Sequence, residues 1–180
     1  MQPGRVLVMG ASGSGTTTLA RALADRWSVP HADADDYYWR PTDPPYVEKR
    51  PVAERLRLMT EMFLPRPAWV LSGSLLGWGD AVVPHLDAVV LCMLRQDLRL
   101  ERLRQREAVR YGERIAQGGD REDAIAEFLA WAAGYDDPDF DGRNRAVHEE
   151  WLAALTCLVL RVDTASPVDQ LVEEIVTAHR

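Results

Sequence analysis

The sequence has one lysine, two cysteines and no long apolar run. Lys49 is the single lysine, so arginine supplies the other 20 of the 21 basic side chains. Neither the two cysteines nor the four histidines have the spacing of a zinc site or of a disulfide framework. No segment approaches the roughly 18 apolar residues of a membrane-spanning helix, and the first apolar run is too short for a signal peptide. We therefore expect a cytoplasmic protein with no membrane partner.

The chain has fewer basic than acidic residues: 21 basic and 28 acidic side chains give a net charge of −7. A chain with this balance is poorly suited to neutralising a phosphate backbone, so we expect no nucleic-acid partner. Hydrophobic residues make up 47% of the chain, which is enough to form a buried core and excludes intrinsic disorder. A length of 180 residues predicts a single domain covering residues 1–180.

Short apolar runs predict the strands. Continuous apolarity, rather than alternation with polar residues, is typical of parallel strands that are covered on both faces. Four runs have this character and a fifth is weaker: Arg5–Met9, Trp69–Ser72, Asp87–Leu94, Thr156–Val162 and Val29–Ala32.

Helical periodicity occupies the segments between these runs. Apolar residues recur at helical spacing in 19–27, 52–63, 97–109, 120–134 and 168–175, the last following Ser166-Pro167, a favourable helix start. Strands that alternate with helices predict an α/β fold with a doubly wound, parallel, five-stranded sheet. Segments 36–68 and 106–150 are too long for ordinary loops, so each is expected to form a small inserted lobe.

A glycine-rich segment directly follows the first apolar run: Gly10-Ala-Ser-Gly-Ser-Gly-Thr-Thr17. Its spacing matches the phosphate-binding P-loop, G-x-x-x-x-G-K-[ST], except that Thr16 stands at the lysine position. Glycines let the backbone curl so that its N–H groups point at phosphate oxygens, and the following helix N-terminus adds partial positive charge. The segment predicts a nucleotide site formed by Gly10, Ala11, Ser12, Gly13, Ser14, Gly15, Thr16, Thr17 and Thr18, with the Thr17 hydroxyl on Mg²⁺.

With this loop and this order of elements, the chain resembles the P-loop kinases of the nucleoside-monophosphate kinase type, which include adenylate, cytidylate and shikimate kinases. The resemblance covers nearly the whole chain. It implies that lobe 36–68 binds the phosphate acceptor, that region 106–150 closes over ATP as a lid, and that ATP and Mg²⁺ are the cofactors. Two positions depart from the family pattern: Thr16 replaces the loop lysine, and Ser72 replaces an acidic residue at the end of the third strand.

Three carboxylates follow the second predicted strand, in Asp33-Ala-Asp35-Asp36. Ligands of open α/β sheets bind at the carboxyl ends of the strands, and a carboxylate there can take the proton of an acceptor hydroxyl. The segment also resembles the Asp-Asp-aromatic-aromatic stretch of uridine and nicotinamide riboside kinases. We expect Asp35 and then Asp33 to act in catalysis, and Asp36 to assist the metal; a solvated acidic loop is the alternative.

Arginine is concentrated in residues 95–114, which hold seven guanidinium groups. Of these, Arg102, Arg106 and Arg110 recur at spacings of four residues and share one helix face. Such a face suits the charge of a phosphoryl group in transfer, and these three arginines are expected to act there. Arg143 and Arg145, where the lid returns, are expected to contact ATP. The alternative is a solvated face in which glutamates such as Glu107 pair with the arginines.

The sequence therefore favours an ATP- and Mg²⁺-dependent phosphotransferase that acts on a small molecule, with a nucleotide or nucleoside as the first choice of acceptor. Two alternatives stay open: a catalytically weak, regulatory nucleotide-binding protein, suggested by Thr16, and a kinase for a small metabolite of the shikimate or gluconate type. The sequence does not determine the acceptor, the choice between ATP and GTP, or the oligomeric state.

Overall fold

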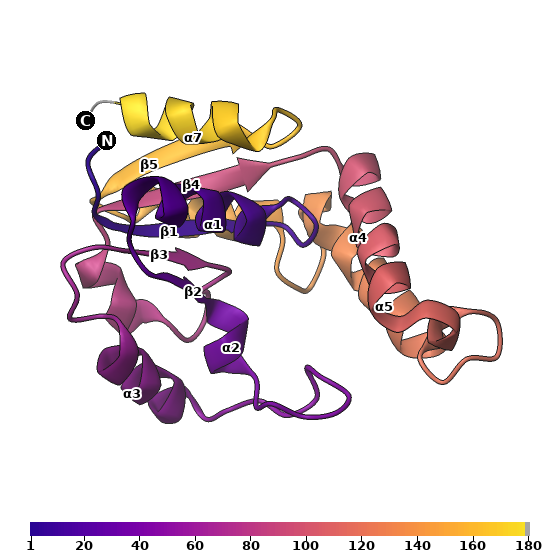
Figure 1. Cartoon of the computed structure of the whole chain (residues 1–180). Helices are drawn as coiled ribbons and strands as arrows, with labels where there is room; N and C mark the ends of the chain where they lie inside the picture. Colours follow the sequence, from indigo (N-terminus) through magenta and orange to yellow (C-terminus); the bar gives the residue numbers. More distant parts are fainter. Residues whose placement is uncertain (179–180) are drawn as a thin grey trace.

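The computed structural model of the protein describes residues 1–178, which fold around a five-stranded parallel sheet with strand order β2-β3-β1-β4-β5 (Figure 1). The strands are β1 (Arg5–Gly10), β2 (His31–Asp33), β3 (Trp69–Ser72), β4 (Ala88–Met93) and β5 (Leu158–Asp163). Each lies within two residues of its predicted position. The doubly wound α/β fold expected from the sequence is confirmed.

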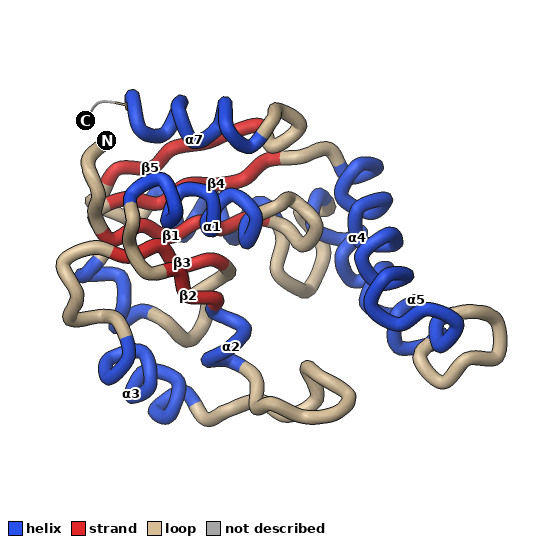
Figure 2. The backbone as a smooth tube through the Cα atoms, viewed as in Figure 1, coloured by secondary structure: helices blue, strands red, loops and turns tan. Residues whose placement is uncertain are grey.

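Helices cover both faces of the sheet (Figure 2). Helices α1 (Thr16–Trp27) and α7 (Val168–Thr177) pack on one face, while α3 (Val52–Met62), a 3-10 helix (Asp80–His85) and α6 (Arg145–Ala153) pack on the other. The central strand explains the two layers. Val6 and Val8 belong to the core under α1 and α7, whereas Leu7 and Met9 belong to the core on the opposite face. A strand that buries successive side chains on both sides must read as continuously apolar, as this one does.

Helices α4 (Gln96–Tyr111) and α5 (Glu122–Ala133) run side by side and project beyond the sheet (Figure 1). Leu103 is the fully buried apolar anchor of α4, and it packs beneath the glycine-rich loop. The chain turns out of α4 at Gly112, which has a φ of 55°. Two further 3-10 turns, Gly112–Ile115 and Gly134–Asp136, flank α5.

The short helix α2 (Ala34–Tyr38) was not among the helices expected from the sequence. Asp33 caps it, because its carboxylate accepts a hydrogen bond from the backbone N–H of Asp35 at 3.1 Å. After α2 the chain makes a long loop, here called loop 39–50, whose two ends are joined by an antiparallel bridge between Trp39 and Lys49. This loop and α3 fill the segment that was predicted as the acceptor lobe; the lobe boundaries remain a prediction.

The carboxyl ends of the parallel strands lie at one edge of the sheet. Pairing places Val8 beside Ser72 and Ser72 beside Asp33, so the end of β1, where the glycine-rich loop begins, lies close to the acidic segment. None of the helices in residues 1–178 is both long and apolar enough to cross a membrane.

Candidate active site

The glycine-rich loop joins β1 to α1 and curls tightly. Gly13 and Gly15 have φ values of 81° and 88°, which residues with a Cβ atom rarely adopt. At Gly10, an added Cβ would lie 2.6 Å from the carbonyl oxygen of Cys92 on the neighbouring strand. The buried hydroxyl of Ser14 donates to the carbonyl oxygen of Ala11 at 2.8 Å and holds the turn closed. The loop thus forms the strand–loop–helix unit that the motif predicts, and Thr16, Thr17 and Thr18 open the helix.

The threonine after the lysine position is tied to the acidic segment. The Thr17 hydroxyl donates to Asp33 Oδ2 at 3.0 Å, and the Ser72 hydroxyl donates to the same oxygen at 2.9 Å. Ser72 Oγ lies 3.0 Å from Nε2 of His31, whose pKa is lowered by burial. The serine that replaces an acidic residue at the end of β3 therefore supports Asp33. Oxygen ligands of this kind are what Mg²⁺ prefers, so Thr17 and Asp33 fit a magnesium site beside bound phosphates.

The predicted metal helper, Asp36, lies elsewhere. It is exposed on α2 and does not line the cavity described below, whereas Asp33 is the carboxylate that reaches Thr17. The short helix explains the difference, because it turns the side chains of successive residues in different directions. No group of three or more potential metal-ligating side chains occurs within residues 1–178.

A cavity of about 720 Å³ opens between the sheet edge, loop 39–50 and the α4–α5 pair. Asp35 and Ser12 are among the residues that line it. The side chain of Asp35 is solvent-exposed, and partial desolvation by the surrounding protein, followed by the charge of Asp33, raises the pKa of Asp35 above its ordinary 3.8. A carboxylate with a raised pKa facing a cavity next to a phosphate-binding loop is suited to accept a proton from a bound hydroxyl.

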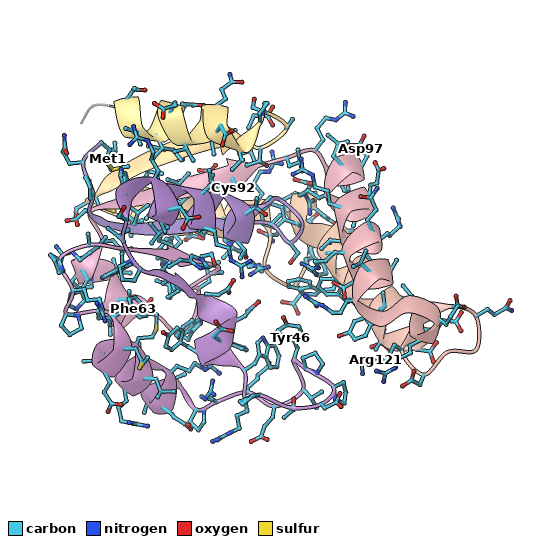
Figure 3. All side chains as sticks on the ribbon, viewed as in Figure 1. Met1, Tyr46, Phe63, Cys92, Asp97 and Arg121 are labelled. Carbon is cyan, nitrogen blue, oxygen red and sulfur yellow. The ribbon has the colours of Figure 1, made fainter. Side chains whose placement is uncertain are left out.

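Aromatic and basic side chains form the rest of the cavity wall. Seven aromatic residues line it: Tyr38, Trp39, Tyr46, Trp78, Tyr111, Phe128 and Trp131. Five basic residues line it, Lys49, Arg106, Arg110, Arg121 and Arg143, against two acidic ones, Asp35 and Glu107. In Figure 3, Tyr46 extends from loop 39–50 toward the α4–α5 pair, on the side where Arg121 lies; the Arg110 guanidinium is 5.5 Å from the Tyr46 ring. The cavity favours an anionic ligand with a flat or apolar face.

The predicted arginines of α4 divide between two places. Arg106 and Arg110 line the cavity, and both pair with the buried Glu107: Arg106 Nε donates to Oε1 at 2.7 Å, and Arg110 Nη1 lies 3.4 Å from Oε2. The pairing with Glu107 that the alternative expected is present, and both arginines also line the cavity, so their roles stay predictions. Arg102 lies instead at the ends of β5 and the glycine-rich loop. Its Nη2 donates to the carbonyl oxygen of Thr164 at 3.0 Å, and its Nη1 is 3.7 Å from where a Cβ on Gly15 would be.

Arg143 and Arg145 are separated by one residue but point to different places. Arg143 reaches the glycine-rich loop, where its Nη2 donates to Ser12 Oγ at 3.1 Å. Arg145 is exposed and pairs with Asp136 at 2.5 Å, and it does not line the cavity. The intervening Asn144 causes this divergence because it caps α6 and accepts a hydrogen bond from Val147 N–H at 2.9 Å.

Arg99 was on the predicted arginine face but was not selected as a site residue. It is fully buried, with its Nη2 2.6 Å from Asp136 Oδ2 and its Nη1 3.4 Å from the carbonyl oxygen of Ser12. A Cβ on Gly13 would lie 2.5 Å from the Arg99 carbonyl oxygen, so the loop rests directly on α4. Sequence reasoning missed the aromatic residues of α5 as well, since apolar periodicity does not distinguish a core face from a cavity wall.

Comparison with known proteins places the chain in a family. No protein-family model matches it. The uncharacterized protein YqaC of Bacillus subtilis (strain 168) is 40% identical over 168 residues, which cover 93% of each chain. This chain belongs to the same family as YqaC.

Solved structures show which fold the family has. A sugar kinase from Janibacter sp. HTCC2649 covers 97% of this chain and 94% of its own with a TM-score of 0.56 and 20% identity. A gluconokinase from Sinorhizobium meliloti 1021 covers 96% and 89% with a TM-score of 0.52 and 18% identity. A shikimate kinase from Acinetobacter baumannii, in complex with shikimate, covers 98% and 92% with a TM-score of 0.55 and 15% identity. The chain has the P-loop kinase fold; membership of the nucleoside-monophosphate kinase type stays a prediction.

Proposed function

We propose that this protein is an ATP- and Mg²⁺-dependent phosphotransferase that moves the γ-phosphoryl group to a small molecule held in the 720 Å³ cavity. One observation carries the proposal: Asp35 and the P-loop residue Ser12 line the same cavity, and Arg143 interacts with both, so a base and a phosphate cradle face one space. Phosphoryl transfer needs this positioning more than it needs covalent help from the protein.

The transfer follows from the side chains around the cavity. An acceptor hydroxyl beside Asp35 passes its proton to the carboxylate as its oxygen bonds to the γ-phosphorus. The bond from that phosphorus to the β–γ bridging oxygen breaks, and ADP leaves with the electron pair. Arg106, Arg110 and Arg143 supply positive charge around the transferred group. Mg²⁺ supplies charge neutralisation on the phosphates when it is bound, and Thr17 and Asp33 are the residues that would hold it, the latter through its bond to Thr17.

The cavity wall favours a hydroxylated metabolite with a negative charge. Five basic against two acidic lining residues leave an excess of three positive charges, and Glu107 already neutralises part of the charge of Arg106 and Arg110. Aromatic rings such as Trp131 and Trp39 can stack on the apolar face of a sugar or cyclic acid. The sugar, gluconate and shikimate kinases of the same fold point in this direction as well. We therefore place a sugar or hydroxy acid ahead of a nucleotide as acceptor.

Release of ADP from MgATP tests the proposal, measured over a panel of sugars, sugar acids, shikimate-like acids, nucleosides and nucleoside monophosphates. We expect turnover with a sugar or hydroxy acid. Turnover with a nucleoside monophosphate alone would restore the acceptor first expected from the sequence. Binding of MgATP with no turnover of any acceptor would favour the regulatory, catalytically weak alternative. A folded protein that binds neither MgATP nor MgGTP would overturn the whole proposal.

A further inference from the structure

The P-loop of this chain lacks the ammonium group that usually lies between the β- and γ-phosphates. Thr16 occupies the lysine position and is the first residue of α1. The single lysine, Lys49, also lines the cavity, but its ammonium lies 5.8 Å from the centres of the Tyr38 and Trp39 rings and, in the described part of the chain, makes no hydrogen bond to the P-loop. The arginines near the P-loop are the other source of positive charge.

Most arginines near the loop already have partners. Arg99 is paired with Asp136, and Arg106 and Arg110 share Glu107. Arg102 donates to the Thr164 carbonyl oxygen at the end of β5. Arg99, Arg106 and Arg110 therefore have a carboxylate partner, whereas Arg102 donates to a neutral carbonyl oxygen and does not line the cavity.

Arg143 differs from these four because it both lines the cavity and donates a hydrogen bond to a P-loop side chain. Its Nη2 donates to the neutral Ser12 hydroxyl of the P-loop, and its buried Nε has no hydrogen-bond partner within residues 1–178. It lines the cavity, its guanidinium lies 5.2 Å from the centre of the Trp131 ring, and the charge of Asp35 acts on it. No carboxylate of residues 1–178 forms an ion pair with it. Asp35 is thus a nearby negative charge but not an ion-pair partner, and a desolvated cation without a paired carboxylate is costly unless a ligand supplies negative charge.

We infer that Arg143 takes the place of the missing P-loop lysine and holds the terminal phosphoryl group of the nucleotide between Ser12 and Asp35. This inference rests on the proposed function. It also explains why position 16 can be a threonine, because a lysine there would add a second positive charge where Arg143 already supplies one. Arg143 is 131 positions from Ser12 in the sequence, so the positive charge comes from outside the P-loop itself.

Calorimetry with two nucleotides tests the inference. The Mg²⁺ complexes of AMPPNP, a non-hydrolysable ATP analogue, and of ADP are titrated into the wild type, Arg143→Met and Arg161→Met. Arg161 is the matched control because it pairs with Glu149 of α6, the helix that follows Arg143, but does not line the cavity. We expect R143M to lose about 10- to 100-fold in affinity for AMPPNP, the range typical of a lost hydrogen bond to a charged group, and much less for ADP. R161M should bind both as the wild type does.

A purely structural role for Arg143 predicts different results. Without nucleotide, R143M should unfold at or near the wild-type temperature, because the Arg143 side chain makes one hydrogen bond, to Ser12, and no ion pair within residues 1–178. A lower melting temperature, failure to fold, or equal losses for AMPPNP and ADP would each overturn the inference. The double variant R143M/T16K should recover most of the AMPPNP affinity that R143M loses. If T16K alone binds AMPPNP but the double variant does not, the inference is contradicted. If the wild type binds no AMPPNP, the proposed function itself fails.

Discussion

The Thr17 hydroxyl donates a 3.0 Å hydrogen bond to Asp33, which ties the helix after the P-loop to the end of β2. Asp33 in turn accepts from the Ser72 hydroxyl and from the Asp35 backbone N–H, so one carboxylate connects three elements. This arrangement fixes the direction of Asp35 relative to the P-loop. It also makes Asp33, rather than Asp36, the acidic partner of the proposed magnesium site.

Asp33 and Asp36 can be separated by the effect of magnesium on nucleotide binding. We expect Asp33→Asn to reduce the gain in AMPPNP affinity on adding Mg²⁺ by about tenfold, the lower end of what loss of an outer-shell partner costs a metal site. Asp36→Asn should have the smaller effect, since Asp33 and not Asp36 accepts the hydrogen bond from the Thr17 hydroxyl. Calorimetry with and without EDTA measures this gain, with Asp25→Asn on α1 as the control. A larger loss in D36N than in D33N would return the role to Asp36.

Asp35 should govern transfer but not nucleotide binding. We expect Asp35→Asn to lose roughly 10²- to 10⁴-fold in turnover, the range for a general base, while MgAMPPNP affinity is retained. The raised pKa of Asp35 adds a pH test. The carboxylate accepts a proton only when it is ionised, so the activity of the wild type should fall on acidification at a pH above 3.8. Full turnover by D35N, or an acid limb no higher than 3.8, would remove Asp35 from the mechanism.

The buried pair between Arg99 and Asp136 should hold the P-loop on α4. The Arg99 side chain is 1% exposed, so Arg99→Met removes a buried donor from Asp136 and from the carbonyl oxygens of Ser12 and Ala132, and should cost about 1–3 kcal/mol of unfolding free energy. Arg145 shares Asp136 but is 52% exposed, and Arg145→Met should cost less than about 1 kcal/mol. Urea unfolding monitored by tryptophan fluorescence compares the two variants. Similar losses would mean that burial does not decide the strength of this pair.

His148 makes stability depend on pH. It is fully buried on α6, its Nδ1 lies 2.7 Å from the Tyr135 hydroxyl, and burial lowers its pKa from 6.5 to about 3. In the unfolded chain the imidazole takes up a proton below pH 6.5, whereas in the folded chain it stays neutral down to about 3. Stability should therefore be lost progressively as the pH falls between these values.

Unfolding free energies at pH 7 and pH 4.5 test the histidine. His148→Gln should show a smaller loss between the two pH values than the wild type does. His85→Gln, in the 3-10 helix on the sheet face, is the control and should keep the wild-type loss. If H148Q and the wild type lose the same amount of stability, the pH dependence arises at other groups.

Patterns among residues close together in the sequence were enough to predict the strands and the glycine-rich loop. Continuous apolarity along β1 follows from burial on both faces of the sheet, and the spacing of Gly10, Gly13 and Gly15 follows from the positive φ values of the last two and the close approach at the first. The sequence could not predict α2, because its five residues are held by the Asp33 cap rather than by helical periodicity.

The sequence alone determined the α/β class, the phosphate-binding loop and the acidic segment after β2, because each depends on residues that are neighbours in the chain. Only the tertiary structure decided which side chains meet. The strand order places Asp33 beside Ser72, and the return of the chain from α5 brings Arg143, but not Arg145, to Ser12. Contacts between residues 131 positions apart depend on how whole elements pack, and no local spacing records that.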